Sequence, residues 1–256
     1  MNLSVRQSSI VDLLRLQGLM SVEGLATYFG VTPQTIRRDL NHLYEAGLVR
    51  RRHGGAELNV LEHNVSFQAR RITQLHAKAR IGMVVASLIP SGASVLLGFG
   101  TTPEQVALAL ADHQDLTVVT NNLSAALALA HNMSHRVVLA GGQLRHPNPE
   151  ILGADAERLF NSFKADFGVS GVGGLDSDGA LLDFDMAESD CHKALRGNAR
   201  RQILVLDHTK FGRRAPVRSG SLEDVDILVC DQAIPEPYRE HIPSSVQVLI
   251  ADEVLS

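Results

Sequence analysis

VTPQTIRRDLNHLYEAGLVRRRHGG, residues 31–55, is the stretch that decides the fold of the N-terminal part of this chain. Thr32 followed by Pro33 predicts the start of a helix, because a threonine hydroxyl caps an unpaired N–H group and proline suits the first helical position. Just upstream, an apolar segment from about Val22 to Phe29, followed by Gly30, predicts a shorter helix and a turn. Two helices joined in this way form a helix–turn–helix.

The helix predicted to begin at Pro33 has two distinct faces. Ile36, Leu40 and Leu43 recur at helical spacing, which predicts a stripe buried against a core. The opposite face carries side chains that hydrogen-bond bases and phosphates, as a helix in the major groove of DNA requires. These candidate DNA contacts are Gln34, Arg37, Arg38 and Asn41.

A basic hairpin is predicted directly after this helix. Gly47 ends the helix, the run LVRRR alternates apolar and basic residues, and residues 53–55 supply a tight turn before a second strand over 56–58. Arg50–Arg52 on such a hairpin add affinity for phosphates that is independent of base sequence and falls with salt. Each element alone is also typical of a solvated surface. Because the cap, stripe, preceding helix and hairpin occur together, we favour a winged helix–turn–helix that binds DNA.

Composition supports a folded protein with one basic end. The 256 residues are 45% hydrophobic and carry a net charge of −4. Residues 1–80 hold 11 Lys and Arg against 6 Asp and Glu, and the remainder holds 13 against 22, so the two parts carry 11 − 6 = +5 and 13 − 22 = −9. Cys191 and Cys230 form no paired motif, so we expect a reducing cytoplasm and neither a disulfide framework nor a zinc site. The first residues do not read as a signal peptide or membrane span.

The rest of the chain predicts an α/β fold with a parallel sheet covered by helices. From residue 74, helix-like stretches alternate with short apolar runs such as SVLLGF, LTVVT, RVVLA, QILVLD and VDILVCD. We therefore expect a DNA-binding domain over residues 1–58, with the helix–turn–helix at about 20–39, a linker over 59–73, and a second domain over 74–256.

Small and polar residues follow the predicted strands, at the edge where parallel strands bind ligands. Glycine amides, helix N-termini and Lys210 favour a phosphate group, while amides and carboxylates favour hydroxyls, so the pattern predicts a small phosphorylated sugar or polyol as ligand. An acidic, glycine-rich segment adds Asp183, Asp185 and Glu188, for which site lining and helix capping remain alternatives. We assign Asp176 and Asp178 to a turn. A metal site is less favoured, because no histidine lies at ligand spacing.

Several motifs, in this order, resemble the DeoR family of bacterial transcriptional regulators: VTPQTIRRDLNHL with RRRHGGA, GFGTTPEQVA, VVTNNL, LAGGQLR, SDGALLDFD and DHTKFGR. The resemblance covers nearly the whole chain. It implies an N-terminal winged helix–turn–helix and a C-terminal sensor domain similar to ribose-5-phosphate isomerase. It also implies a homodimeric or homotetrameric repressor of a sugar or polyol catabolic operon, released from double-stranded operator DNA by a phosphorylated metabolite, with glycerol-3-phosphate as the first candidate.

Motifs and resemblance together place the functional residues. The alternative function is a sugar-phosphate isomerase or deaminase, but a DNA-binding segment has no use in such an enzyme, and we expect no catalytic residue, cofactor or metal. In one departure from the family pattern, His192 stands where a lysine often follows the glutamate, and the lysine is displaced to Lys193. The expected DNA contacts are Thr32, Gln34, Thr35, Arg37, Arg38, Asn41, Arg51, Arg52 and His53. The expected effector contacts are Gly100, Thr101, Thr102, Thr120, Asn121, Asn122, Gly141, Gly142, Asp183, Asp185, Glu188 and Lys210.

Overall fold

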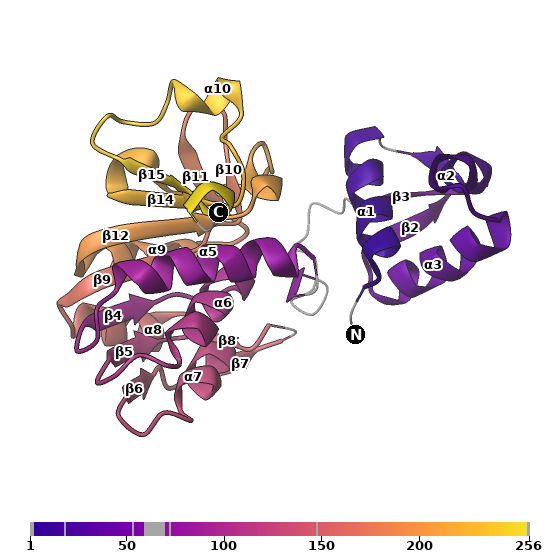
Figure 1. The fold of residues 1–256 in the computed structure, drawn as a ribbon. Helices are drawn as coiled ribbons and strands as arrows, with labels where there is room; N and C mark the ends of the chain where they lie inside the picture. Colours follow the sequence, from indigo (N-terminus) through magenta and orange to yellow (C-terminus); the bar gives the residue numbers. More distant parts are fainter. Residues whose placement is uncertain are drawn as a thin grey trace. The chain divides into compact units, whose positions relative to one another are not determined.

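The chain folds as two compact units, Met1–Leu75 and His76–Ser256, in a computed structural model (Figure 1). The predicted linker over 59–73 lies largely outside the described part of the chain, and the predicted domain boundaries stay predictions. No helix among the described residues is long and apolar enough to cross a membrane. The residues described are 3–17, 19–52, 54–58, 70–71, 73–146 and 148–254.

The N-terminal unit packs three helices against a small antiparallel sheet of order β1-β3-β2 (Figure 1). The last two strands form the hairpin that the sequence predicts, so the unit is a winged helix–turn–helix. The first helix and the short first strand were not predicted from the sequence. The elements are α1 (Val5–Gln17), β1 (Met20–Ser21), α2 (Val22–Phe29), α3 (Pro33–Glu45), β2 (Val49–Arg52) and β3 (Gly55–Leu58).

Local capping sets the helix boundaries in this unit. The Ser21 hydroxyl accepts a hydrogen bond from the Gly24 amide at 2.9 Å and begins α2. Gly30 ends α2 with φ +63°, a left-handed conformation that glycine adopts without strain. Thr32 then caps α3, and Pro33 is its first residue, as predicted. The apolar stripe of α3 is fully buried, and its members are Ile36, Leu40 and Leu43.

The second unit is built on a seven-stranded parallel sheet of order β15-β14-β12-β9-β4-β5-β6. This arrangement confirms the predicted α/β fold class. Its strands are short apolar runs, because both faces of the sheet are covered by helices. They are β4 (Ser94–Leu97), β5 (Thr117–Thr120), β6 (Arg136–Leu139), β9 (Ala165–Ser170), β12 (Ala199–Leu206), β14 (Ile227–Cys230) and β15 (Gln247–Ile250).

Helices cover the two faces of the sheet in separate groups. One face packs against α5 (Leu75–Leu88), α6 (Thr101–Leu110) and α7 (Leu123–Leu129) in the largest apolar cluster. The other face packs against α8 (Ala154–Asn161) and α9 (Met186–Gly197) through residues such as Phe160 and Leu195.

Helices α5 and α6 approach each other unusually closely at a glycine. A Cβ atom placed on Gly82 of α5 would lie 2.6 Å from the carbonyl oxygen of Gln105 in α6. No side chain larger than a hydrogen fits there without moving the backbone.

Smaller elements surround the parallel sheet and were not predicted from the sequence. Three strands form a separate antiparallel sheet of order β10-β11-β13, and two more form the hairpin β7–β8. The turn between β10 and β11 holds Asp176 and Asp178, whose carboxylates accept backbone N–H groups, as the turn assignment requires. The elements are β7 (Leu144–Arg145), β8 (Glu150–Ile151), β10 (Gly174–Leu175), β11 (Ala180–Asp183), η1 (His208–Lys210), β13 (Val217–Ser221), η2 (Leu222–Asp224), α10 (Glu236–Arg239) and α11 (Ala251–Val254).

Candidate functional site

The polar face of α3 is exposed on the surface of the N-terminal unit. Gln34, Arg37, Arg38 and Asn41 are all exposed, while the apolar stripe of the same helix is buried. Arg37 lies 3.6 Å from Glu23 of α2, but both side chains are more than 60% exposed, so this ion pair contributes little. The helix therefore presents hydrogen-bond donors in the arrangement that a major-groove helix needs.

Thr32 and Thr35, two further candidate DNA contacts, form hydrogen bonds at the start of α3. The Thr32 hydroxyl accepts from the Thr35 amide at 3.3 Å, and the two hydroxyls lie 2.9 Å apart. Both threonines thus stabilise the first turn of the helix.

A buried carboxylate fixes α3 against α1. Asp39 is 4% exposed, and it accepts from Arg6 Nε at 2.7 Å and from Gln7 Nε2 at 3.0 Å. Asp39 was not predicted to anchor the helix, although it lies beside the apolar stripe in the run IRRDL. The contact orients the exposed face of α3 relative to the rest of the unit.

Glu57 neutralises part of the positive charge of the wing, the hairpin formed by β2 and β3. Arg52 Nε lies 2.5 Å from Glu57 Oε1, and Arg50 is ion-paired with the same oxygen. The hydrogen bond from Arg52 lowers the pKa of Glu57 below its usual range, with a further contribution from Arg50. Of the three wing arginines, two are therefore paired within the hairpin.

Arg51, the third arginine of the β2–β3 hairpin, contacts helix α3. Arg51 Nη2 donates to Asn41 Oδ1 at 3.0 Å, and its guanidinium lies 4.8 Å from the centre of the Tyr44 ring. Two predicted DNA contacts, Asn41 and Arg51, are thus joined, which holds the wing beside α3. His53, predicted to contact DNA, lies outside the described residues.

In the second unit the strand order reverses between β4 and β9. From β4 the chain proceeds through β5 to β6 on one side, and from β9 through β12 and β14 to β15 on the other. Ligands of open α/β sheets bind outside the carboxyl ends of the strands at such a switch point. The loops after β4 and β9 are therefore the centre of the candidate effector site.

The loop after β4 leads into a helix whose N-terminus no side chain caps. Gly100 is the N-cap of α6 with φ +113°, and the following Thr101 and Thr102 are buried. Asn122, after β5, donates to the Gly100 carbonyl at 3.1 Å and accepts from the Ala125 amide at 3.2 Å. Asn122 thus ties together two loops that were both predicted to bind the effector.

The remaining residues of the predicted glycine and threonine set have different surroundings. The Thr120 hydroxyl accepts from the Asn122 amide at 3.1 Å and is fully buried. Gly141 and Gly142, after β6, are exposed, and Gly142 has φ +134°. The exposed glycines leave their backbone accessible, whereas Thr120 supports the loop from inside.

Lys210 lies beside a buried carboxylate at the end of β12. Asp207 accepts from the Thr209 amide at 3.0 Å and pairs with Lys78 of α5, whose Nζ lies 3.9 Å away. Burial alone would raise the pKa of Asp207, but the charges of Lys78 and Lys210 and the bonds from Thr209 lower it to about 2. Part of the positive charge of Lys210 therefore already compensates Asp207.

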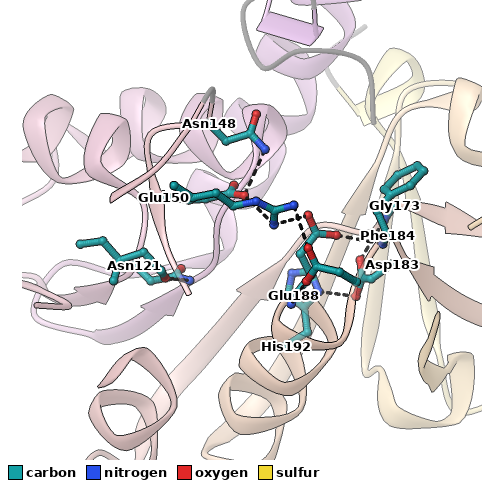
Figure 2. A network of polar contacts seen from close by, with 11 residues as sticks. Asn121, Asn148, Glu150, Gly173, Asp183, Phe184, Glu188 and His192 are labelled. Carbon is teal, nitrogen blue, oxygen red and sulfur yellow. Dashed lines mark hydrogen bonds and ion pairs between the residues drawn. The ribbon is translucent and has the colours of Figure 1, made fainter. Parts of the chain in front are cut away.

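The acidic segment before α9 is held by an arginine that was not predicted from the sequence. Arg145 of β7 lies 2.7 Å from Asp185, 2.8 Å from Glu188 and 3.4 Å from Glu150. Burial lowers the pKa of Arg145, but these three carboxylates outweigh it and raise the pKa. Figure 2 shows Glu150 and Glu188 turned toward this network.

Two of the predicted acidic residues also shape the start of α9. Asp185 caps the helix by accepting from the Glu188 amide at 3.0 Å, and Glu188 accepts from the Phe184 amide at 2.9 Å. Asp183 is 1% exposed and holds His192, with Nδ1 and Oδ2 2.8 Å apart (Figure 2). The displaced Lys193 is 52% exposed and lies near Asp190.

Known protein families match both units. Residues 6–61 match the DeoR-like helix-turn-helix domain, and residues 73–232 match the DeoR C terminal sensor domain. The chain belongs to the DeoR family. This DeoR-family protein therefore combines a DNA-binding helix–turn–helix with a sensor domain, as its two folded units indicate.

Curated relatives align with nearly the full length of the DeoR-family chain. The glycerol-3-phosphate regulon repressor of Escherichia coli (strain K12) is 44% identical over 230 residues, covering 90% of this chain and 91% of that protein. The glycerol-3-phosphate regulon repressor of Haemophilus influenzae is 43% identical over 250 residues, covering 98% and 97%. The E. coli repressor CsqR is 36% identical over 249 residues, covering 97% and 95%.

These relatives are transcriptional repressors, so the alternative of a sugar-phosphate isomerase or deaminase is not supported. A solved ribose-5-phosphate isomerase from Neisseria gonorrhoeae overlaps 56% of each chain with a TM-score of 0.39 and 14% identity. An overlap at this level carries no argument about function.

Proposed function

We propose that this protein is a transcriptional repressor of a polyol catabolic operon, released from its operator by a phosphorylated polyol, with glycerol-3-phosphate as the effector. The polar face of α3 is the observation that supports DNA binding. On it, Gln34, Arg37, Arg38 and Asn41 are exposed beside the basic wing. The 44% identity to a glycerol-3-phosphate regulon repressor supports the choice of operon and effector.

In this proposal the recognition helix reads bases and the wing contacts phosphates. Arg37 and Arg38 suit base edges, while Arg51 and its neighbours add affinity that depends on salt. Glu57 lowers the affinity of the wing for DNA, because phosphates compete with its carboxylate for Arg50 and Arg52. A single winged helix buries too little DNA for tight specific binding, so we propose a homodimer or homotetramer acting in the cytoplasm.

The effector binds, in this proposal, at the switch-point edge of the sensor sheet. The N-terminus of α6 after Gly100 and the ammonium of Lys210 favour the phosphate group, because backbone N–H groups and a cation both stabilise an anion. Arg145 and its ion-pair partners Asp185 and Glu188 line the side of the proposed site that faces the start of α9. Effector binding favours a state of the oligomer that fits the operator less well, which requires different effector affinities in the two states.

Gel retardation with the full-length protein tests the proposal. Duplexes carrying the promoters of the host's glycerol-use genes are incubated with the protein, with and without millimolar glycerol-3-phosphate. We expect retardation that the effector reverses and that an Arg37→Ala, Arg38→Ala double variant abolishes, with Arg239→Ala on α10 as an exposed-arginine control. Retardation that glycerol-3-phosphate leaves unchanged contradicts the effector assignment, and no retardation at low salt contradicts the repressor assignment.

A further inference from the structure

The imidazole of His192 is held rigidly at the centre of the sensor unit. The residue lies on α9 and is 2% exposed. Its Nδ1 lies 2.8 Å from Asp183 Oδ2, and its ring stacks on Phe99 with centroids 4.4 Å apart and 14° between the planes. Asp183 is fixed in turn, because its Oδ1 accepts from the Gly173 amide at 3.1 Å. Residues from the loops after β4 and β9 therefore set the orientation of the ring.

The other nitrogen of this ring has no protein partner. Nε2 of His192 is buried and forms no hydrogen bond within the described part of the chain. Oδ1 of Asn121, after β5, is also buried and forms no hydrogen bond with the described residues. Nδ2 of the same side chain donates to the Ile151 carbonyl at 2.9 Å. Buried polar atoms are almost always paired in folded proteins, because an unpaired one loses its hydrogen bonds to water without replacement. Nε2 of His192 and Oδ1 of Asn121 are therefore available to a ligand.

Residues that contact the side chains of His192 and Asn121 belong to one apolar cluster. Phe99, which stacks on His192, and Ile151, which accepts from Asn121, belong to one cluster together with Cys191, the neighbour of His192. This cluster lies at the carboxyl ends of the strands, beside the switch point. Figure 2 shows both residues around the network that also contains Glu150 and Glu188.

The fixed partners decide which chemistry the free atoms offer. A carboxylate only accepts, so Nδ1 of His192 carries a proton that faces Asp183, and in the neutral imidazole the second nitrogen, Nε2, is an acceptor. Asn121 must direct its NH₂ group at the Ile151 carbonyl, so its Oδ1 is also an acceptor. The oxygens of a phosphate dianion only accept, so they satisfy neither Asn121 Oδ1 nor Nε2 of the neutral imidazole. A hydroxyl group donates and satisfies either one.

We propose that His192 is a specificity-determining residue that accepts a hydrogen bond from a hydroxyl group of the effector, with Asn121 as a second acceptor. Asp183 is a positioning residue, since it fixes the ring and its proton. This inference rests on the proposed function, and it divides the effector site into a phosphate end at α6 and η1 and a hydroxyl end at His192. The sensor then distinguishes a polyol phosphate from a plain alkyl phosphate of the same length.

Calorimetric titration of the full-length protein with two probes tests this division. Glycerol-3-phosphate and propyl phosphate share a three-carbon chain and a phosphate, but only the first has hydroxyls. The variant His192→Asn keeps an amide nitrogen at the Nδ1 position facing Asp183 and removes Nε2. We expect roughly tenfold weaker binding of glycerol-3-phosphate by this variant, the usual effect of one lost hydrogen bond, and unchanged binding of propyl phosphate. His241→Asn, at an exposed position, is the matched control.

Two results overturn the inference. Equal loss for both probes means that His192 contacts the phosphate or only supports the fold, and no loss for either means that it contacts nothing on the effector. If His192→Asn does not fold, Asn121→Ser provides the same comparison, because it removes the second acceptor and should show the same hydroxyl-selective loss. Wild-type protein that binds neither glycerol-3-phosphate nor any other phosphorylated polyol in a panel refutes the proposed effector class itself, which a failure of the variant alone does not.

Discussion

Replacing Asp207 by asparagine should destabilise the sensor unit in a way that depends on pH. Asp207 is 1% exposed and pairs with Lys78, and its pKa is lowered from 3.8 to about 2. At 1.36 kcal/mol for each pKa unit, this difference corresponds to about 2 kcal/mol of stability near neutral pH. Removing the carboxylate also leaves Lys78 buried without that charge, so the total loss at pH 7 should be about 3–5 kcal/mol.

The pH dependence follows from the direction of the pKa shift. Because the folded pKa of Asp207 lies below the unfolded value, its contribution is complete above about pH 5 and declines as the pH falls toward 2. The difference in unfolding free energy between wild type and Asp207→Asn should therefore shrink by about 1 kcal/mol between pH 6 and pH 3.

Urea unfolding at several pH values measures this difference. Far-UV circular dichroism follows the whole chain, and hydrogen exchange of peptides from β12 assigns the transition to the sensor unit. Asp252→Asn is the matched control, since Asp252 pairs with Arg80 of the same helix α5 but is 47% exposed and should cost less than about 1 kcal/mol. A loss below 1 kcal/mol at pH 7 for Asp207→Asn, or a difference that does not change with pH, would refute the reasoning.

Three other outcomes are expected. Arg37→Ala should weaken operator binding by about 1–3 kcal/mol in a gel-retardation titration without changing the melting temperature, and unaltered binding would exclude Arg37 from the DNA interface. Lys210→Ala should still bind the operator but should not respond to glycerol-3-phosphate, and a normal response would show that the phosphate binds elsewhere. Burial raises the pKa of Cys191 to about 11 and that of Cys230 to about 12, so neither thiol should react with Ellman's reagent at pH 8 until urea is added, and rapid labelling of the native protein would contradict their burial.

Features that depend on short stretches of sequence were predictable. The start of α3 at Pro33, the end of α2 before Gly30 and the buried stripe of α3 each follow from capping or periodicity within a few residues. The parallel strands were predictable for a similar reason, since each is a continuous apolar run followed by small or polar residues.

The contacts between distant segments were not predictable in the same way. Arg145 meets Glu188 across 43 residues of sequence, and the run LAGGQLR gives no sign of that carboxylate. The sequence shows that His192 stands where the family often has a lysine. Only the fold shows that Asp183 and Phe99 fix the orientation of its ring. Side-chain pairing across loops depends on the register of the whole sheet, which one sequence does not specify.

Asn122 links two loops at the carboxyl-terminal edge of the sensor sheet. One amide holds the carbonyl of Gly100 in one loop and the first turn of α7 after the next strand. We therefore expect a displacement of either loop to strain the hydrogen bonds that Asn122 makes with the other.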